Sequence, residues 1–138
     1  MQAVHTAVAH PWLCDIMGHV TTRHYVAIFD DASYLFLFKV FGWSGDDAAE
    51  RGQGWADVRH EIEYLAEVAA GDLVEIRAEF AKVGNKSITI RYEMFNLNKQ
   101  EIAATLVSTS VLFDLNERQA IALTEDMRSA AAALLGTA

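Results

Sequence analysis

The residues best suited to chemistry lie in the segment Asp15-Ile16-Met17-Gly18-His19-Val20, which comes just before a long apolar stretch. Asp15 supplies a carboxylate, Gly18 indicates a tight turn, and the spacing of the apolar residues that follow predicts a helix over 22–41. The first N–H groups of a helix have no intrahelical partner and lie at the positive end of its dipole, so they can bind a polarised carbonyl oxygen. A carboxylate beside such a helix start is suited to attack on an activated carbonyl. The alternative is that Asp15 only forms a turn.

His19 lies in the same loop and could act as a second acid or base. Alternatively, its ring only fixes the loop by hydrogen bonding to the backbone. His24 is five residues further on and does not share a helix face with His19, and no cysteine or carboxylate completes a set of ligands. We therefore expect no metal site.

One long helix and a series of strands must position these residues. We expect a strand near 4–9, the helix 22–41, a polar loop over 44–54 with at most one helical turn, and a final helix over 124–135. Between them, three alternating strands precede a long apolar strand over 102–115, with a hairpin turn at Gly84-Asn85. In the first alternating strand, Val58, His60, Ile62 and Tyr64 are predicted to face one way, and Asp57, Arg59, Glu61 and Glu63 the other.

Composition narrows the class of protein. The chain has 138 residues, 52% of them apolar, which is enough to form one domain over 1–138 with a core that needs no disulfide. A net charge of −8 argues against a nucleic-acid partner. The single cysteine suits a reducing compartment, and neither a signal peptide nor an apolar run of 18 residues is visible. We expect a soluble cytoplasmic protein with no membrane partner.

A long apolar helix and a curled antiparallel sheet pack most simply when the sheet wraps around the helix. Together with this order of elements, the segment Asp15-x-x-Gly18-His19-Val20 resembles the signature of the 4-hydroxybenzoyl-CoA thioesterase family. The likeness continues at Tyr25, Ala32-Ser33, Gly42, Tyr64, Gly71-Asp72 and Gly84-Asn85-Lys86-Ser87. The resemblance implies the α+β hotdog fold, a five-stranded antiparallel sheet curled around one central helix.

The resemblance also implies hydrolysis of an acyl-CoA thioester. Asp15 matches the family's catalytic aspartate, acting as a nucleophile or as a general base. Backbone N–H groups near 21–23 would polarise the carbonyl. The catalytic set is then Asp15, Gly18, His19 and Thr22. Because CoA is part of the substrate, no separate cofactor is expected.

For the substrate, the resemblance implies two further groups of residues. Tyr25, Asp30 and His60 would border the acyl group, although Asp30 could instead reach solvent or a subunit interface. The coenzyme would be bound by residues of the hairpin, namely Lys82, Asn85, Lys86 and Ser87. In many relatives, these hairpin residues come from a neighbouring subunit. The alternative for the lysines is that they protect the sheet edge from strand pairing.

The acyl group and the assembly stay open at this stage. The aromatic residues Trp12, Phe29, Tyr34, Phe36 and Trp55 suit an aromatic, a short aliphatic or a cationic acyl group. A non-catalytic acyl-CoA-binding or ligand-sensing hotdog protein is the alternative function.

The oligomeric state is predicted from the edges of the sheet. If the apolar strand 102–115 lies at a sheet edge, it needs a partner, so we expect a homodimer or a dimer of dimers.

Overall fold

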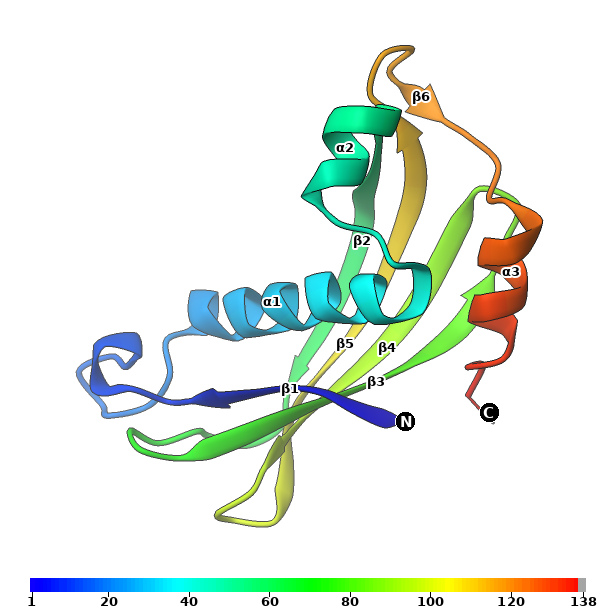
Figure 1. Cartoon of the computed structure of the whole chain (residues 1–138). Coiled ribbons are helices and arrows are strands. Elements are labelled where there is room, and N and C mark those ends of the chain that lie inside the picture. Colours follow the sequence, from blue (N-terminus) through cyan, green and yellow to red (C-terminus); the bar gives the residue numbers. More distant parts are fainter. Residues whose placement is uncertain (137–138) are drawn as a thin grey trace.

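The computed structural model describes residues 1–136, and its main elements follow the predicted order (Figure 1). The strands are β1 (Gln2–Val8), β2 (Gln53–Tyr64), β3 (Leu73–Val83), β4 (Ser87–Asn96), β5 (Glu101–Asp114) and β6 (Gln119–Ala120). The helices are α1 (Thr22–Phe41), α2 (Gly45–Arg51) and α3 (Glu125–Ala132), with a single 3-10 turn, η1 (Pro11–Leu13). The sequence pattern does not predict η1 or β6, because each is too short to show a periodicity.

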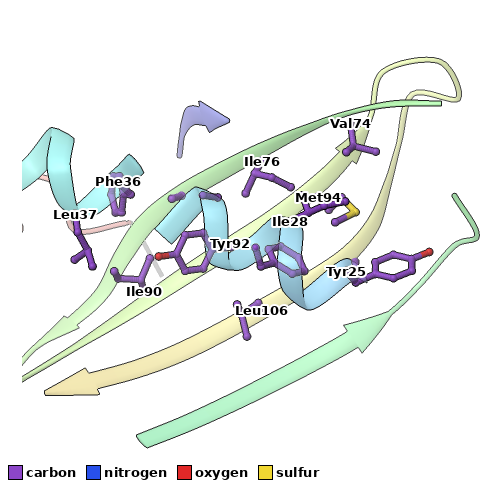
Figure 2. Close-up of a cluster of buried hydrophobic side chains, with 14 of the residues drawn as sticks. Tyr25, Ile28, Phe36, Leu37, Val74, Ile76, Ile90, Tyr92, Met94 and Leu106 are labelled. Carbon is purple, nitrogen blue, oxygen red and sulfur yellow. The ribbon is translucent and has the colours of Figure 1, made fainter. Parts of the chain in front are cut away.

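The central helix α1 has the predicted bounds. It ends where Gly42 adopts a left-handed backbone (φ 66°) and donates its N–H to the carbonyl of Phe38 at 2.8 Å. The buried face of α1 consists of Tyr25, Ile28, Phe29, Ala32, Phe36 and Leu37. Figure 2 shows this face packed on β3, β4 and β5, with the Tyr25 hydroxyl pointing away from the cluster.

The opposite face of α1 is also apolar in part. Tyr34, Leu35 and Phe38 are exposed in the single chain. In one copy of the protein, α1 is therefore covered by the sheet on one side and exposes apolar side chains on the other. None of the helices within residues 1–136 is long and apolar enough to cross a membrane.

The sheet is antiparallel, with the strand order β1-β3-β4-β5-β2, and β6 pairs with the end of β5. Its curved face carries α1 (Figure 1). The predicted alternation is confirmed in β3 and β4, whose inward side chains are Val74, Ile76, Ala78, Phe80, Ile88, Ile90, Tyr92 and Met94. The five long strands and the helix that they wrap are the predicted hotdog architecture.

The premise that the apolar strand over 102–115 lies at an edge is wrong. β5 pairs with β4 on one side and with β2 on the other, so neither of its edges is open. A continuous apolar run is typical of a strand inside a sheet. The outer strands are β1 and β2, and only β2 carries a long row of charged side chains.

The predicted faces of β2 hold only for its second half. The register between β2 and β5 shifts between Asp57 and Arg59, which makes Val58 the extra residue of a β-bulge. Asp57 therefore lies opposite Ser110 and shares the inner face with His60, while Val58 is exposed. Strict alternation along the strand predicts that Asp57 lies on the outer face. This prediction is wrong because a bulge interrupts the alternation and leaves no clear mark in the sequence.

The chain ends differ slightly from the predicted bounds. β1 starts two residues earlier than expected and stops at Val8, because Ala9 pairs with the turn at Gly71 and Asp72. The hydroxyl of Thr124 caps α3 by accepting the N–H of Met127 at 3.1 Å, as predicted. α3 ends at Ala132 and not at residue 135, because the chain then turns to pair with β3.

Candidate active site

The loop before α1 fixes one oxygen of the Asp15 carboxylate. The Asp15 N–H donates to the carbonyl of His19 at 2.8 Å, and the Gly18 N–H donates to the carbonyl of Asp15 at 3.0 Å. Asp15 Oδ1 accepts the N–H of Met17 at 2.9 Å and, more weakly, that of His19 at 3.4 Å. Asp15 Oδ2 has no hydrogen-bond partner among residues 1–136. An oriented carboxylate with one free oxygen suits a nucleophile or a general base.

Gly18 gives the loop its shape. Its φ of 80° is in the left-handed region, where side chains are strained, although no atom lies within 4 Å of the position of an added Cβ. The need for glycine here is therefore conformational and not steric. The Gly18 carbonyl accepts the N–H of Ala70 at 3.1 Å, and His19 forms an isolated bridge with Ala69. The segment between β2 and β3 thus supports the Asp15 loop.

The start of α1 leaves backbone donors free. Thr21 donates its N–H to the carbonyl of Leu13 at 2.9 Å, so this amide is not available to a ligand. The N–H groups of Thr22 and Arg23 have no acceptor within the described residues. The Thr21 side chain makes no capping bond either. The predicted cluster of donors near 21–23 therefore narrows to the amides of Thr22 and Arg23.

Asp15 and Thr22 line the same cavity, which has a volume of about 290 Å³. Its other walls are Met17, His19, Val20, Tyr25, Tyr64, Leu65, Ala66 and Glu67. The rings of Tyr25 and Tyr64 meet edge to face, with centroids 5.2 Å apart. The structure thus brings together three of the four predicted catalytic residues and Tyr25, while Gly18 shapes the adjoining turn.

Glu67 and Tyr64 also line this cavity, although neither is among the predicted catalytic or substrate-binding residues. His19 Nε2 lies 3.2 Å from Glu67 Oε2, so a carboxylate orients the ring of His19. Glu67 follows the end of β2 in an irregular segment, and no sequence motif marks it. Tyr64 is visible in the sequence only as part of the family resemblance.

Tyr25 is a neutral hydrogen-bond donor in this cavity. Burial raises the pKa of its hydroxyl, and the negative charge of Glu67 raises it further, against a hydrogen bond with the Val68 backbone that lowers it. The side chain is nevertheless in contact with the cavity. Tyr25 can therefore orient a substrate but does not supply a base.

Asp72 holds the supporting segment in place. Its Oδ2 accepts the N–H of Ala69 and the side-chain amide of Asn96, both at 2.9 Å, and lies 3.2 Å from Lys99 Nζ. Burial raises the pKa of Asp72, but the hydrogen bonds from Asn96 and Ala69 and the charge of Lys99 outweigh it, so the pKa is lowered overall. The carboxylate is only 14% exposed.

We expect Asp72→Ala to lower the free energy of unfolding by about 1–3 kcal/mol at pH 7, because it leaves the buried amide of Asn96 without a partner. Since the folded-state pKa is depressed, the stabilisation is present above the unfolded pKa of about 3.9 and is lost as the pH falls through the folded value. Urea denaturation at pH 7 and near pH 3 measures both effects. A difference between wild type and variant that does not shrink in acid would contradict the ionic part of this account.

Asp30 and His60 lie outside this cavity. They line a separate small hollow together with Asp57, whose Oδ2 is 3.5 Å from His60 Nε2. Asp30 is eight residues after Thr22 on α1, which is about 12 Å along the helix axis. These predicted substrate residues are therefore grouped with each other but not with Asp15, and Asp57 joins them unpredicted.

The predicted coenzyme residues lie at the far end of the sheet. Lys82, Asn85, Lys86 and Ser87 surround the turn from β3 to β4, whereas the start of β3 adjoins the Asp15 loop (Figure 1). The 11 residues of β3 separate the two ends by about 35 Å. Asn85 Oδ1 also accepts a hydrogen bond from Arg128 Nη2 at 2.9 Å. One chain alone does not bring these residues to Asp15.

The predicted aromatic residues divide into three groups. Phe29 and Phe36 are fully buried in the core, and Trp12 is 74% exposed and stacks on His10. Tyr34 and Trp55 line a hollow that also includes Asp30, and Phe29 forms part of the wall of the hollow at Asp30 and His60. A larger recess of about 520 Å³ lies at the C-terminal end of α1, beside α2 and α3. Residues 1–136 hold no group of three or more His, Cys, Asp or Glu side chains placed to bind a metal ion.

Comparison with known proteins assigns the class. Residues 9–131 match the model of the thioesterase-like superfamily, and the chain therefore belongs to this superfamily. None of the curated proteins matches the chain.

Several solved structures share the fold. A hypothetical protein from Staphylococcus aureus, solved in complex with CoA, has a TM-score of 0.90 at 18% identity, over 99% of this chain and 88% of that one. A protein from Pseudomonas aeruginosa has a TM-score of 0.85 at 25% identity, over 99% and 95%. A 1,4-dihydroxy-2-naphthoyl-CoA thioesterase from Synechocystis has a TM-score of 0.82 at 17% identity, over 94% and 95%. The hotdog fold is thereby confirmed.

Proposed function

We propose that the protein hydrolyses an acyl-CoA thioester to a free acid and CoA at the cavity between Asp15 and the start of α1. The observation that carries this proposal is that Asp15, with a free carboxylate oxygen, lines one cavity together with Thr22, whose backbone N–H has no acceptor within the described residues. The N–H of Arg23, which also has no acceptor there, follows directly on α1. Thioester hydrolysis needs both a base or nucleophile and donors for the carbonyl oxygen. The CoA in the Staphylococcus aureus relative and the thioesterases among the similar structures support the choice of substrate.

In this mechanism the thioester carbonyl oxygen accepts hydrogen bonds from the N–H groups of Thr22 and Arg23. Asp15 Oδ2 removes a proton from a water molecule as the water oxygen bonds to the carbonyl carbon. The negative charge that develops on the carbonyl oxygen is stabilised by the same N–H groups. The C–S bond then breaks, the thiolate of CoA leaves and takes up a proton, and the acid is released. Alternatively, Asp15 attacks the carbon itself, and water hydrolyses the resulting anhydride.

A thiol-release assay tests this function. We expect at least one acyl-CoA from a panel that differs in chain length, aromaticity and charge to release free CoA in the presence of the protein. Calorimetric titration with the same panel is run in parallel. If several acyl-CoAs bind but none is hydrolysed, the protein is a binding module and the proposed activity is wrong.

The coenzyme is predicted to contact the hairpin lysines of a neighbouring copy. Changing Lys82 and Lys86 together to alanine should raise KM for acyl-CoA by up to about thirtyfold, because each of the two exposed ion pairs contributes at most about 1 kcal/mol. The dependence of KM on salt should weaken, with a smaller effect on kcat. Lys39→Ala, at the exposed end of α1, is the matched control. If KM and its salt dependence stay unchanged in the double variant, the phosphates bind elsewhere.

We also propose that the protein is a homodimer or a dimer of dimers. β2 is an outer strand with an open edge, and Tyr34, Leu35 and Phe38 leave apolar surface on the neighbouring helix. Both features favour a second copy as the covering partner. Light scattering at micromolar concentration should give twice or four times the mass of one chain, and Val58→Lys on the β2 edge should reduce it. A monomeric mass for the wild-type protein would contradict the assembly.

A further inference from the structure

Three hollows lie between α1 and β2, starting at the candidate active site, and we refer to this row of hollows as the groove. On α1, the side chains of Thr22, Val26, Asp30 and Ser33 follow one another at helical spacing along one stripe. On β2, the inner face presents Tyr64, Ile62, His60, Asp57 and Trp55, which lie opposite the inward residues of β5. The cavity at Asp15 occupies one end of this groove, and two smaller hollows, of about 10 and 60 Å³, follow it.

The two smaller hollows share a pair of carboxylates. Asp30 and Asp57 line both, together with Ser33. Asp57 Oδ1 accepts the hydroxyl of Ser110 at 2.6 Å, so its carboxylate is held in place. Partial burial raises the pKa of Asp30, and the negative charge of Asp57 raises it further. Among the described residues, neither hollow is lined by a lysine or an arginine, and only His60 can offset the negative charge.

A buried polar side chain also faces this hollow. Tyr92 is only 1% exposed, yet it lines the hollow beside Asp30, Asp57 and His60. Its hydroxyl makes no hydrogen bond within residues 1–136. Burial raises the pKa of Tyr92, and the negative charges of Asp57 and Asp30 raise it further. The Tyr92 hydroxyl is not itself fully buried, since the fully buried side-chain atoms without a partner among the described residues are Trp55 Nε1 and Arg128 Nε, and it can therefore bond a further polar group in the hollow.

Aromatic rings form the far end of the groove. Tyr34, Trp43 and Trp55 line a hollow of about 60 Å³ together with the two carboxylates. The rings of Tyr34 and Trp43 lie 6.0 Å apart, and the Trp43 indole is anchored by its N–H, which donates to the carbonyl of Gln53 at 3.4 Å. Trp55 stacks on Phe41 with centroids 5.5 Å apart. The rings are therefore held by contacts of their own.

We propose that this groove selects an acyl group that carries an ammonium cation at its far end. Aromatic faces attract cations through their quadrupole, and the two carboxylates supply the opposite charge. The inference rests on the proposed function, because it takes the carbonyl to lie at the start of α1. The distance of about 12 Å along α1 from Thr22 to Asp30 implies an extended chain between the carbonyl and the cation. An anionic acyl group would be repelled from the same place.

The test compares acyl-CoAs of equal chain length that end in a trimethylammonium, a tert-butyl or a carboxylate group. The first two have nearly the same shape and differ in charge. We expect kcat/KM to be about tenfold or more higher for the trimethylammonium compound than for the tert-butyl compound, and lowest for the carboxylate. An acyl-CoA that ends in a primary ammonium group distinguishes the contribution of the carboxylates from that of the aromatic rings. A higher kcat/KM for this compound than for the trimethylammonium compound would show that the carboxylates contribute more.

Variants then locate the charge preference. In Asp57→Asn and Asp30→Asn, the ratio of kcat/KM between the cationic and the neutral compound should fall toward one. Glu63→Gln removes the same charge from the outer face of β2 and should leave the ratio as in the wild type. A ratio near one in the wild-type protein, or a ratio that these aspartates do not change, would overturn the inference and leave the proposed hydrolysis standing.

Binding provides a measurement that does not depend on turnover. The free ω-trimethylammonio acid should change the fluorescence of Trp43 and Trp55 and bind more tightly than the tert-butyl acid. This result would support the groove even if no acyl-CoA were hydrolysed, in which case only the proposed function fails. If Asp57→Asn weakens self-association and leaves the binding of both acids unchanged, the carboxylates serve a second copy of the chain and the inference is wrong.

Discussion

Asp15→Asn should lower kcat by at least about 10²-fold, within the range of lost acid–base catalysis. The structure explains why the fold should survive. The oxygen of the new amide can take the place of Oδ1 and still accept the N–H of Met17, while the amide nitrogen takes the place of the unpartnered Oδ2. The variant thus loses the anion and keeps the turn. Steady-state kinetics of CoA release with any acyl-CoA that the wild type hydrolyses measure the effect.

Asp126→Asn is the matched control, because it makes the same change in the first turn of α3. It should leave kcat as in the wild type. The thermal unfolding midpoint of Asp15→Asn should stay within a few degrees of the wild-type value. Turnover by Asp15→Asn near the wild-type rate would show that the base lies elsewhere, with His19, which lines the same cavity, as the next candidate.

Thr22→Pro should lower kcat by about 10²–10³-fold, because it removes one backbone donor to the developing oxyanion. Few positions allow this test without loss of fold. Thr22 is the first residue of α1, where proline is well tolerated and where the N–H has no partner within the described residues. Thr21, which precedes it, already has the extended backbone (φ −65°, ψ 140°) that a residue before proline prefers.

Thr22→Ala separates the backbone from the side chain at this position. It keeps the N–H and removes the hydroxyl, so its kcat should stay near the wild-type value. Circular dichroism should show the same helix content for both variants. If Thr22→Pro is folded and fully active, the amide of Thr22 does not bind the carbonyl oxygen. If Thr22→Ala is as impaired as Thr22→Pro, the hydroxyl and not the amide is the functional group.

The sequence predicts the elements that have a period. The 20 residues of α1 and the alternation of β3 and β4 are long enough for their apolar spacing to be unambiguous, and the structure agrees with them. The placement of Asp15, His19, Thr22 and Tyr25 around one cavity follows from the same reasoning, because a short loop and a helix start are close in sequence and therefore close in space.

Features that depend on distant contacts could not be predicted. Glu67 contacts His19 from a segment without periodicity. The N–H of Thr21 donates to the carbonyl of Leu13 through a loop contact and is therefore not free to bind a ligand. The strand order, which places β5 inside the sheet and β2 at its edge, is set by pairing between strands far apart in the chain. Local pattern carries no information on such pairing.

The bulge at Val58 has a consequence for how related chains are aligned over β2. The bulge absorbs Val58, so that Asp57, Arg59 and His60 pair with the consecutive residues Thr109 and its two neighbours on β5. Loss of Val58 would therefore leave a regular strand on which Asp57 and His60 still face α1, whereas a strand that kept Val58 in its ladder would turn Asp57 to the solvent side. The face on which position 57 lies thus depends on whether the strand bulges and not only on the residue at that position. An alignment that places a one-residue gap at position 58 keeps the inner faces of two such strands in register.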